Sequence, residues 1–335
     1  MRNLITDIDG VRVGHAQDRA LASGTTAIVF DKAAVAAVDV RGGGPGTRET
    51  ELLDPAMTVE TVEAIVLSGG SAFGLDAAAG AQAWLVEQGR GFAIGSARVP
   101  IVPTAIVFDL LNGGDKRWGR FPPYRDLGYA AASNAAKGFA LGSAGAGLGA
   151  TTVNLKGGLG SASERLSSGI MVGALVIVNA CGSVTVGDGP HFWAAPFEIG
   201  NEFGGRGFPS AMPRDALAPR IKGGAGENTT IALVATDAAL NPGQARRLAM
   251  MAQTGLARAI YPVHTPLDGD VVFAAATGAK PLADPVRGLA EIGAIAANVL
   301  ARAVARAVYE AEALPFPGAL PAWRDKFGRE PVSTD

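Results

Sequence analysis

The sequence predicts a layered protein of the α/β class, with short buried strands and a few helices. Hydrophobic residues make up 48% of the 335 residues and charged residues 18%, which is enough apolar side chain for a large core. The 46 glycines gather in short clusters between apolar runs, as tight turns between strands require. A few segments show helical spacing of apolar residues. Because no linker and no repeat divides the chain, we expect one domain over residues 1–335.

The first part of the chain is expected to be mostly strands. Short β-prone runs span 25–30 and 35–40, and a glycine-rich loop follows at 42–46. The run 61–67 fits a helix and a strand equally well, because apolar periodicity does not separate the two at this length. Spacing of Ala, Leu and Trp then predicts a helix over 73–88, which Gly89 would cap.

The middle of the chain alternates between loops and regular elements. Residues 112–124 are polar, aromatic and proline-containing, which indicates a surface loop that borders a site. A helix is expected over 126–138. The runs 170–179 and 183–186 are expected to form a β-hairpin. Residues 188–226 are rich in Gly, Pro and aromatics without a period, which is typical of a long functional or mobile loop.

The pattern in the last part of the chain predicts two strands and two helices. Strands are expected at 230–235 and 270–275. Asn241-Pro242 is a favourable helix start, so a helix should run over 242–253. The clearest helix is 290–312, where Ile and Val mark one apolar stripe. The tail from Pro315 is expected to be extended.

Charge and cysteine content exclude several classes of function. A net charge of −2 with scattered Lys and Arg gives no reason to expect nucleic acid or an anionic membrane as a partner. The single Cys181 cannot form an internal disulfide, so we expect a reducing compartment, the cytoplasm. The first residues contain no apolar signal core. The uncharged run 169–187 contains polar and Gly residues and is interpreted as buried strands rather than a membrane span.

Metal and cofactor sites have little support. His15, His191 and His264 are far apart and show no ligand spacing, so we expect no metal. His264 is interpreted as a structural hydrogen-bonding residue rather than a base. The loop Gly145–Ala150 fits a loose dinucleotide fingerprint, but the residues after it do not predict the helix that would hold a phosphate. We therefore expect no cofactor.

Two hydroxyl residues are candidates for a nucleophile. Ser71, in the run 69–74, lies in a partial nucleophile-elbow pattern that has Phe73 where the motif requires Gly. Thr229 lies where a polar stretch meets a strand of buried type. If the Asn228–Thr229 peptide bond were cut, Thr229 would carry a free α-amine beside its own hydroxyl. An α-amine has a pKa of about 7.7–8 and can act as a base at neutral pH.

Two carboxylates form a further candidate cluster. Asp268 and Asp270 are two residues apart on an extended chain, so they point to the same side, and Gly269 between them leaves room for another group. Paired carboxylates can orient a base and relay protons. The spacing is also compatible with a turn before a strand or a weak cation site.

Five segments, in this order, resemble one family. They are 6–15, 68–76, 145–150, 228–230 and 264–273. Together they resemble the aminopeptidase/D-amidase-esterase family, which includes β-aminopeptidases and the endo-type nylon-oligomer hydrolase. The resemblance implies a self-cleaving hydrolase of N-terminal-nucleophile type, with a four-layer α-β-β-α sandwich, a small peptide or amide as substrate, and a homotetramer of cleaved protomers.

The resemblance also assigns roles at the site. Thr229 matches the nucleophile, where other members use Ser, and Asp268 and Asp270 match the acidic pair of the nylon-hydrolase branch. Asn179 matches an amide donor on the oxyanion side, a chemically suitable role. Two supporting positions differ from the family. The family Lys aligns with Asn154, and Lys156 follows two residues later. The family Tyr aligns with Phe108.

The expected chemistry follows from these assignments. The hydroxyl of Thr229 attacks the carbonyl of Asn228 and water resolves the ester, which gives fragments 1–228 and 229–335. The same hydroxyl then forms an acyl-enzyme with the substrate, while the carboxylates position the amine and the hydroxyl, and Asn179, with NH groups of the Gly145–Ala150 loop, binds the oxyanion. Three alternatives stay open: a serine hydrolase that uses Ser71, a dinucleotide-dependent oxidoreductase, and a non-catalytic binding relative.

Overall fold

The computed structural model describes residues 1–223 and 228–328. Its strands pair in the order β3-β7-β4-β2-β11-β10-β9-β8, with β1 on β2, and β5 and β6 form a separate hairpin. The strands are β1 (Val11–Asp18), β2 (Ser23–Val40), β3 (Thr47–Arg48), β4 (Thr61–Ser68), β5 (Phe92–Ile94), β6 (Ala97–Val99), β7 (Thr104–Ile106), β8 (Gly158–Arg165), β9 (Met171–Asn179), β10 (Thr229–Ala238) and β11 (Val271–Lys280). The α-helices are α1 (Ala77–Glu87), α2 (Tyr124–Ser133), α3 (Pro242–Ala259), α4 (Pro285–Tyr309) and α5 (Trp323–Phe327).

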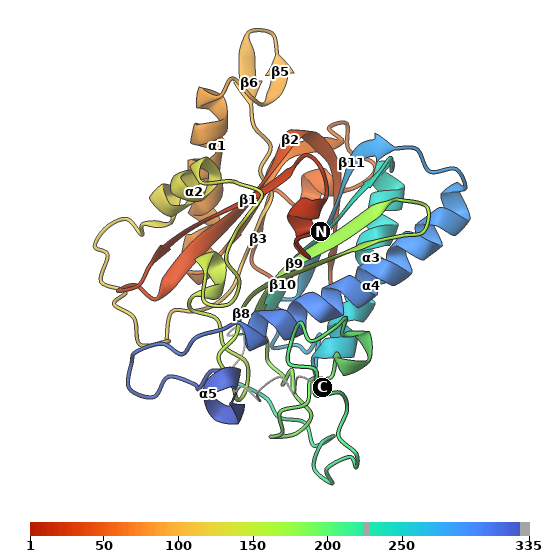
Figure 1. The fold of residues 1–335 in the computed structure, drawn as a ribbon. Coiled ribbons are helices and arrows are strands. Elements are labelled where there is room, and N and C mark those ends of the chain that lie inside the picture. The colour runs from red at the N-terminus through yellow and green to blue at the C-terminus, as the bar shows by residue number, and fades with distance from the viewer. Residues whose placement is uncertain (224–227, 329–335) are drawn as a thin grey trace.

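The long strand β2 belongs to both halves of the sheet. Its first half pairs with β1 and β4, and residues 35–40 pair with β11. Helices α1 and α2 lie on one side of the molecule, and α3 and α4 lie on the other (Figure 1). The strands between them therefore form two β-layers that are continuous through β2. This is the expected four-layer α-β-β-α sandwich.

Three apolar clusters fill the spaces between the four layers. Side chains of α1 and α2 pack on one face of β2 and β4, around Ala78, Leu85 and Val66. The middle cluster lies between the two β-layers and includes Phe30 and Phe273. The third packs α3 and α4 on β9, β10 and β11. Alternation along each strand sends successive side chains to different clusters, which is why these strands are buried on both faces.

Several element boundaries differ from the sequence prediction. The runs 25–30 and 35–40 are one strand, and the ambiguous run 61–67 is strand β4. The helix expected over 73–88 begins as a 3₁₀ segment, Ser71–Asp76, before α1. The expected helix 126–138 instead spans Tyr124–Ser133. The helices expected at 242–253 and 290–312 are present, the first with the Asn241 cap in place.

The expected hairpin of 170–179 with 183–186 is wrong. Strand β9 already has β8 on one edge and β10 on the other, so no edge is left for a returning strand. The segment after it turns away and forms single bridges, Ser183 to Tyr261 and Thr185 to Phe192. The tail expected to be extended contains the short helix α5.

Strand β8 was not expected, because its sequence is rich in Gly and Ser. The glycines of this strand allow another element to pack closely on it, and they do not form a turn. A Cβ on Gly160 would lie 1.9 Å from the carbonyl oxygen of Ala303, and one on Gly158 would lie 2.4 Å from that of Ala307. Both carbonyls belong to α4, so glycine lets this helix approach the sheet closely.

Helix α4 is long and apolar. Within residues 1–223 and 228–328 it is the one helix long and apolar enough to cross a membrane by length and composition, and 61% of its most apolar stretch is buried in the fold. It packs on α3, β8 and β9. Burial of this kind is typical of a core helix.

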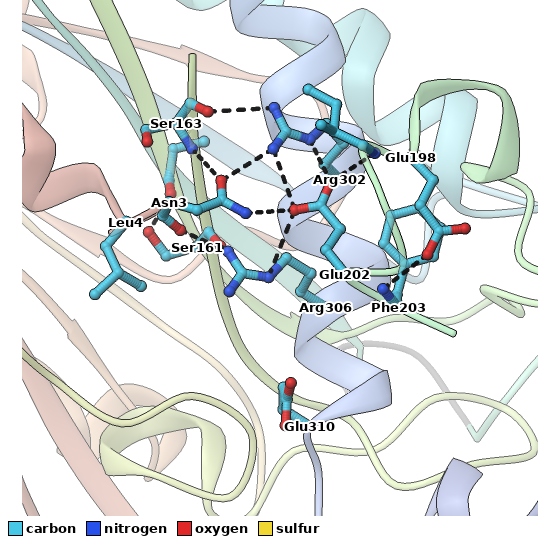
Figure 2. Close-up of polar contacts among 12 residues, drawn as sticks. Asn3, Leu4, Ser161, Ser163, Glu198, Glu202, Phe203, Arg302, Arg306 and Glu310 are labelled. Atoms are coloured by element: carbon cyan, nitrogen blue, oxygen red, sulfur yellow. Dashed lines mark hydrogen bonds and ion pairs between the residues drawn. The ribbon is translucent and has the colours of Figure 1, made fainter. Parts of the chain in front are cut away.

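A buried ionic network attaches the long loop 188–226 to α4 (Figure 2). Glu202 of this loop accepts hydrogen bonds from Nε of Arg302 at 2.5 Å and from the amide of Asn3 at 2.5 Å. Arg306 adds an ion pair at 3.8 Å. Burial raises the pKa of Glu202, but the hydrogen bond and charge of Arg302 outweigh it, so the net pKa is lowered.

We expect Glu202→Gln to destabilise the fold by about 3–5 kcal/mol, because it leaves two arginines without their buried counter-charge. A control is Asp31→Asn, which breaks an exposed pair with Arg12 and should cost less than about 1 kcal/mol. Urea unfolding at neutral pH measures both. Equal losses in the two variants would contradict a special role for Glu202.

The same network predicts a pH dependence. Because the folded pKa of Glu202 lies below its ordinary value, its contribution is complete above about pH 4.3 and is lost as the pH falls through the folded pKa. The gap in unfolding free energy between the wild type and Glu202→Gln should therefore narrow in acid.

Candidate active site

Thr229 is the first residue of β10 and its side chain is buried. In the antiparallel ladder it lies directly opposite Asn179, the last residue of β9. The hydroxyl of Thr229 lies 2.5 Å from the carbonyl oxygen of Asn228 and donates to it. The same carbonyl accepts a hydrogen bond from the backbone NH of Gly269 at 2.8 Å. Two donors thus converge on the oxygen of the peptide bond that was expected to be cut.

Asp270, the residue just before β11, is fully buried. One carboxylate oxygen accepts the backbone NH of Thr230 at 2.7 Å. The other lies 2.9 Å from Nδ1 of His264 and accepts the backbone NH of the same residue at 3.0 Å. Asp270 therefore fixes Thr230 and the loop 264–269 in one arrangement. His264 has the structural contact that the sequence suggested.

Asp268 holds the other side of the same loop. It accepts the backbone NH and the hydroxyl of Thr265, at 2.9 and 2.8 Å, and the backbone NH of Cys181 at 3.1 Å. Burial, followed by the charge of Asp270, raises the pKa of Asp268. The described hydrogen bonds of the two carboxylates go to the surrounding backbone, to Thr265 and to His264, and none goes to the hydroxyl of Thr229. The two carboxylates therefore hold the backbone around Thr229 in place.

Asn179 connects the ladder to a neighbouring cavity. Its amide nitrogen donates to the backbone carbonyl of Phe108 at 3.0 Å. Its amide oxygen accepts the backbone NH of Thr151 at 3.0 Å and the ammonium of Lys222 at 3.1 Å. The amide that the resemblance assigns to an oxyanion therefore binds the Phe108 carbonyl in this arrangement.

Of the two candidates for the family lysine, Lys156 is the one at the cavity. Its ammonium is buried and donates to three backbone carbonyls, those of Gly147, Ala150 and Gly157, at 2.7–3.0 Å. Its pKa is lowered to about 7, mainly by burial; the charge of Asp109 opposes this shift and the charge of Lys222 adds to it. Asn154 instead lies beside Thr152 and Ser183, with contacts of 3.4 Å.

A cavity of about 350 Å³ lies next to Asn179. Its lining contains both polar and apolar side chains. The polar ones include Asp109, Thr151, Lys156 and Lys222, and the apolar ones include Phe108, Leu111, Leu314 and Leu320. Phe108, where the family has Tyr, contributes a ring rather than a hydroxyl.

The sequence did not single out Lys222 or Asp109, and it indicated Gly269 only as a residue that leaves room between the two aspartates. Lys222 lies in an aperiodic loop, and Gly269 acts through a backbone NH, which no side-chain pattern records. Asp109 is buried and accepts the backbone NH of Gly70 at 2.8 Å. Burial raises its pKa.

The other candidate sites have poorer geometry. The Gly145–Ala150 loop contains only a short 3₁₀ turn, so the helix N-terminus that a dinucleotide needs is not there. Ser71 has a φ of +52° and lies between β4 and α1, in a place like that of a nucleophile elbow. The three histidines, however, contact other groups. His15 contacts Thr26 and Ala140, His191 contacts Gly207, and His264 contacts Asp270. In the described part of the chain, no group of three or more His, Cys, Asp or Glu could hold a metal.

Two β-layers between pairs of helices are the architecture of the N-terminal-nucleophile class of hydrolase fold, which solved structures similar to this chain share. The chain belongs to peptidase family S58, whose model matches residues 3–319. It is thus a peptidase or amide hydrolase of that family, and the resemblance drawn from the sequence is confirmed.

Relatives and solved structures agree with this placement. An uncharacterized aminopeptidase of Mycobacterium tuberculosis is 45% identical over 97% of this chain and 98% of its own length. A 6-aminohexanoate-oligomer endohydrolase of Kocuria sp. is 30% identical over 81% of this chain and 74% of its own length. A β-aminopeptidase of Burkholderia sp. covers 99% of this chain and 96% of its own with a TM-score of 0.71 at 22% identity. The L-aminopeptidase D-Ala-esterase/amidase of Ochrobactrum anthropi covers 98% and 95%, with a TM-score of 0.69 at 22% identity.

Proposed function

We propose that this chain cuts itself between Asn228 and Thr229, and that Thr229 is then the N-terminal nucleophile of an aminopeptidase or amidase. The main support is the contact of the Thr229 hydroxyl with the Asn228 carbonyl oxygen at 2.5 Å. The backbone NH of Gly269 on the same oxygen is the kind of donor that stabilises a developing oxyanion.

The self-cleavage step would proceed by attack of the Thr229 hydroxyl oxygen on the carbonyl carbon of Asn228. The C–N bond breaks, the hydroxyl proton goes to the leaving nitrogen, and an ester joins the two residues. Water then hydrolyses this ester, which leaves a carboxylate on Asn228 and a free α-amine on Thr229. Asp268 and Asp270 support the step by fixing the loop that carries Gly269.

In turnover, the free α-amine of Thr229 would take the proton of its own hydroxyl as the latter attacks a substrate amide. An acyl-enzyme forms, the amine product leaves, and water releases the acid. The relatives are named for aminopeptidase activity and for hydrolysis of 6-aminohexanoate oligomers, so small peptides or linear amides are the proposed substrates. A homotetramer of cleaved protomers in the cytoplasm is part of the same proposal.

The test is the intact mass of the purified protein after incubation near neutral pH. Two masses that match 1–228 and 229–335 are the expected result. One stable mass for the whole chain would contradict self-cleavage and would favour the Ser71 hydrolase or the non-catalytic binding relative.

A further inference from the structure

A segment near the end of the chain forms part of the lining of the 350 Å³ cavity. It spans residues 312–321, joins α4 to α5 (Figure 1), and is called the C-terminal strap below. All of it is described, and it contains no helix or strand. Its prolines lack the backbone NH that a helix or a ladder needs. The strap residues that line the cavity are Leu314, Pro317, Gly318, Ala319 and Leu320.

The C-terminal strap is held at both ends. At its start, the hydroxyl of Ser143 donates to the backbone carbonyl of Glu312 at 2.7 Å and accepts the backbone NH of Glu312 at 3.0 Å. At its end, the backbone NH of Lys156 donates to the carbonyl of Pro321 at 2.9 Å. Trp323, just beyond, is 1% exposed and stacks on Phe192. The strap is therefore a fixed wall and not a loose chain end.

Between its two ends the strap separates the cavity from solvent. Pro315 and Pro317 are exposed, whereas Leu314 and Leu320 are half-buried at the cavity. Neither leucine belongs to the apolar clusters that fill the spaces between the four layers. The side chains of these leucines can therefore be changed without disturbing the core.

The cavity lies close to the proposed nucleophile. Asn179 is opposite Thr229 in the ladder, where paired Cα atoms are about 4.5–5.5 Å apart. The amide group of Asn179 binds the backbone of Phe108 and of Thr151, and both of these residues line the cavity. A group attached to an amide at Thr229 would therefore be within a side chain's reach of the cavity and of the strap.

The lining favours an uncharged group. Lys156 and Lys222 already donate to backbone carbonyls, so an anionic group would have to compete with these acceptors. An apolar group makes no such demand, and it can pack on Leu314 and Leu320 of the strap. A pocket with fixed walls distinguishes apolar groups that differ by one methylene by about 10–200-fold.

We propose that the C-terminal strap determines substrate specificity: Leu314 and Leu320 select an uncharged apolar group on the amide substrate and limit the size of that group. This inference deepens the proposed function and rests on it for the nature of the ligand, because the cavity is taken as the place where part of the substrate binds. The reacting end of the substrate is left to Thr229 and its neighbours.

The experiment uses the full chain with Thr229→Ala, so that amide probes are not hydrolysed. The probes are acetamide, phenylacetamide and naphthylacetamide, which share one amide and differ in the apolar group, and NMR titration gives their Kd values. Phenylacetamide should bind at least about ten-fold more tightly than acetamide. Adding Leu320→Ala widens the cavity and should raise the affinity for naphthylacetamide relative to phenylacetamide by about ten-fold, whereas Leu320→Trp should lower the same ratio.

Two further variants keep the test decisive. Leu314→Ala should shift the ratio in the same direction as Leu320→Ala, and it does not depend on whether Leu320→Trp folds. Val286→Ala removes an apolar side chain that is 83% exposed at the start of α4 and should leave the ratio unchanged.

An unchanged ratio in both leucine-to-alanine variants would overturn the role of the strap. Equal affinities for phenylacetamide and acetamide would overturn the apolar site itself. Failure of the proposed self-cleavage would show separately, as a single mass of the wild-type chain, and would not alter these binding results.

Discussion

Thr229→Ala is expected to give one uncut chain of 335 residues with no measurable amide hydrolysis. The substitution removes the hydroxyl that lies 2.5 Å from the Asn228 carbonyl oxygen, and with it the proposed nucleophile of turnover. Loss of a nucleophile typically lowers the rate by at least about 10⁴-fold. Because alanine is smaller and the site is at the start of a strand, the fold should persist, so the loss is chemical.

The neighbouring threonine provides a matched control. Thr230 is buried, and its hydroxyl has no hydrogen-bond partner among the described residues, so Thr230→Val changes little except polarity. Mass spectrometry should find both fragments with Thr230→Val and neither with Thr229→Ala. Ser71→Ala should retain cutting and activity. If the Thr229→Ala chain were still cut after Asn228, or if Ser71→Ala alone abolished hydrolysis, the assignment of the nucleophile would be wrong.

The part of the site that could be predicted from the sequence is the part carried by side chains at strand ends. Thr229 stands where a polar stretch meets a strand, and Asp268 and Asp270 share one side of an extended segment, so local pattern and resemblance drew attention to all three. The structure places Thr229, Asp268 and Asp270 at one site. Their roles in catalysis stay predictions, because the contacts of the carboxylates are to the surrounding loop.

The rest depends on contacts between segments far apart in the chain. Lys222 meets Thr151 and Asn179 only after the long loop folds back over the sheet. Strand β8 was missed for a similar reason: Gly158 and Gly160 lower strand propensity but allow the close approach of α4. In both cases tertiary packing decides the local structure, and a single sequence read in windows contains no signal for it.

A methyl group at position 269 is the most specific test of the carbonyl-binding geometry. A Cβ on Gly269 would lie 2.6 Å from the carbonyl oxygen of Gly44 and 2.9 Å from the hydroxyl oxygen of Thr229. Both distances are shorter than real contacts, so the loop or the threonine must move. The backbone NH would then lose its 2.8 Å hydrogen bond to the Asn228 carbonyl. We expect Gly269→Ala to slow self-cleavage by about 10²–10³-fold, the usual effect of losing one oxyanion donor.

The measurement is the rate at which the two fragments form after synthesis, followed by mass spectrometry. Gly138→Ala is the matched control, because a Cβ there meets nothing within 4 Å and its φ needs no glycine. Urea unfolding separates the two causes of a loss: overpacking should cost Gly269→Ala about 1–3 kcal/mol and leave it folded. A folded but slowly cut chain supports the arrangement of the Gly269 NH and the Thr229 hydroxyl around the Asn228 carbonyl as the one that self-cleavage requires. Cutting at the wild-type rate would mean that the NH of Gly269 stabilises the loop and takes no part in the reaction.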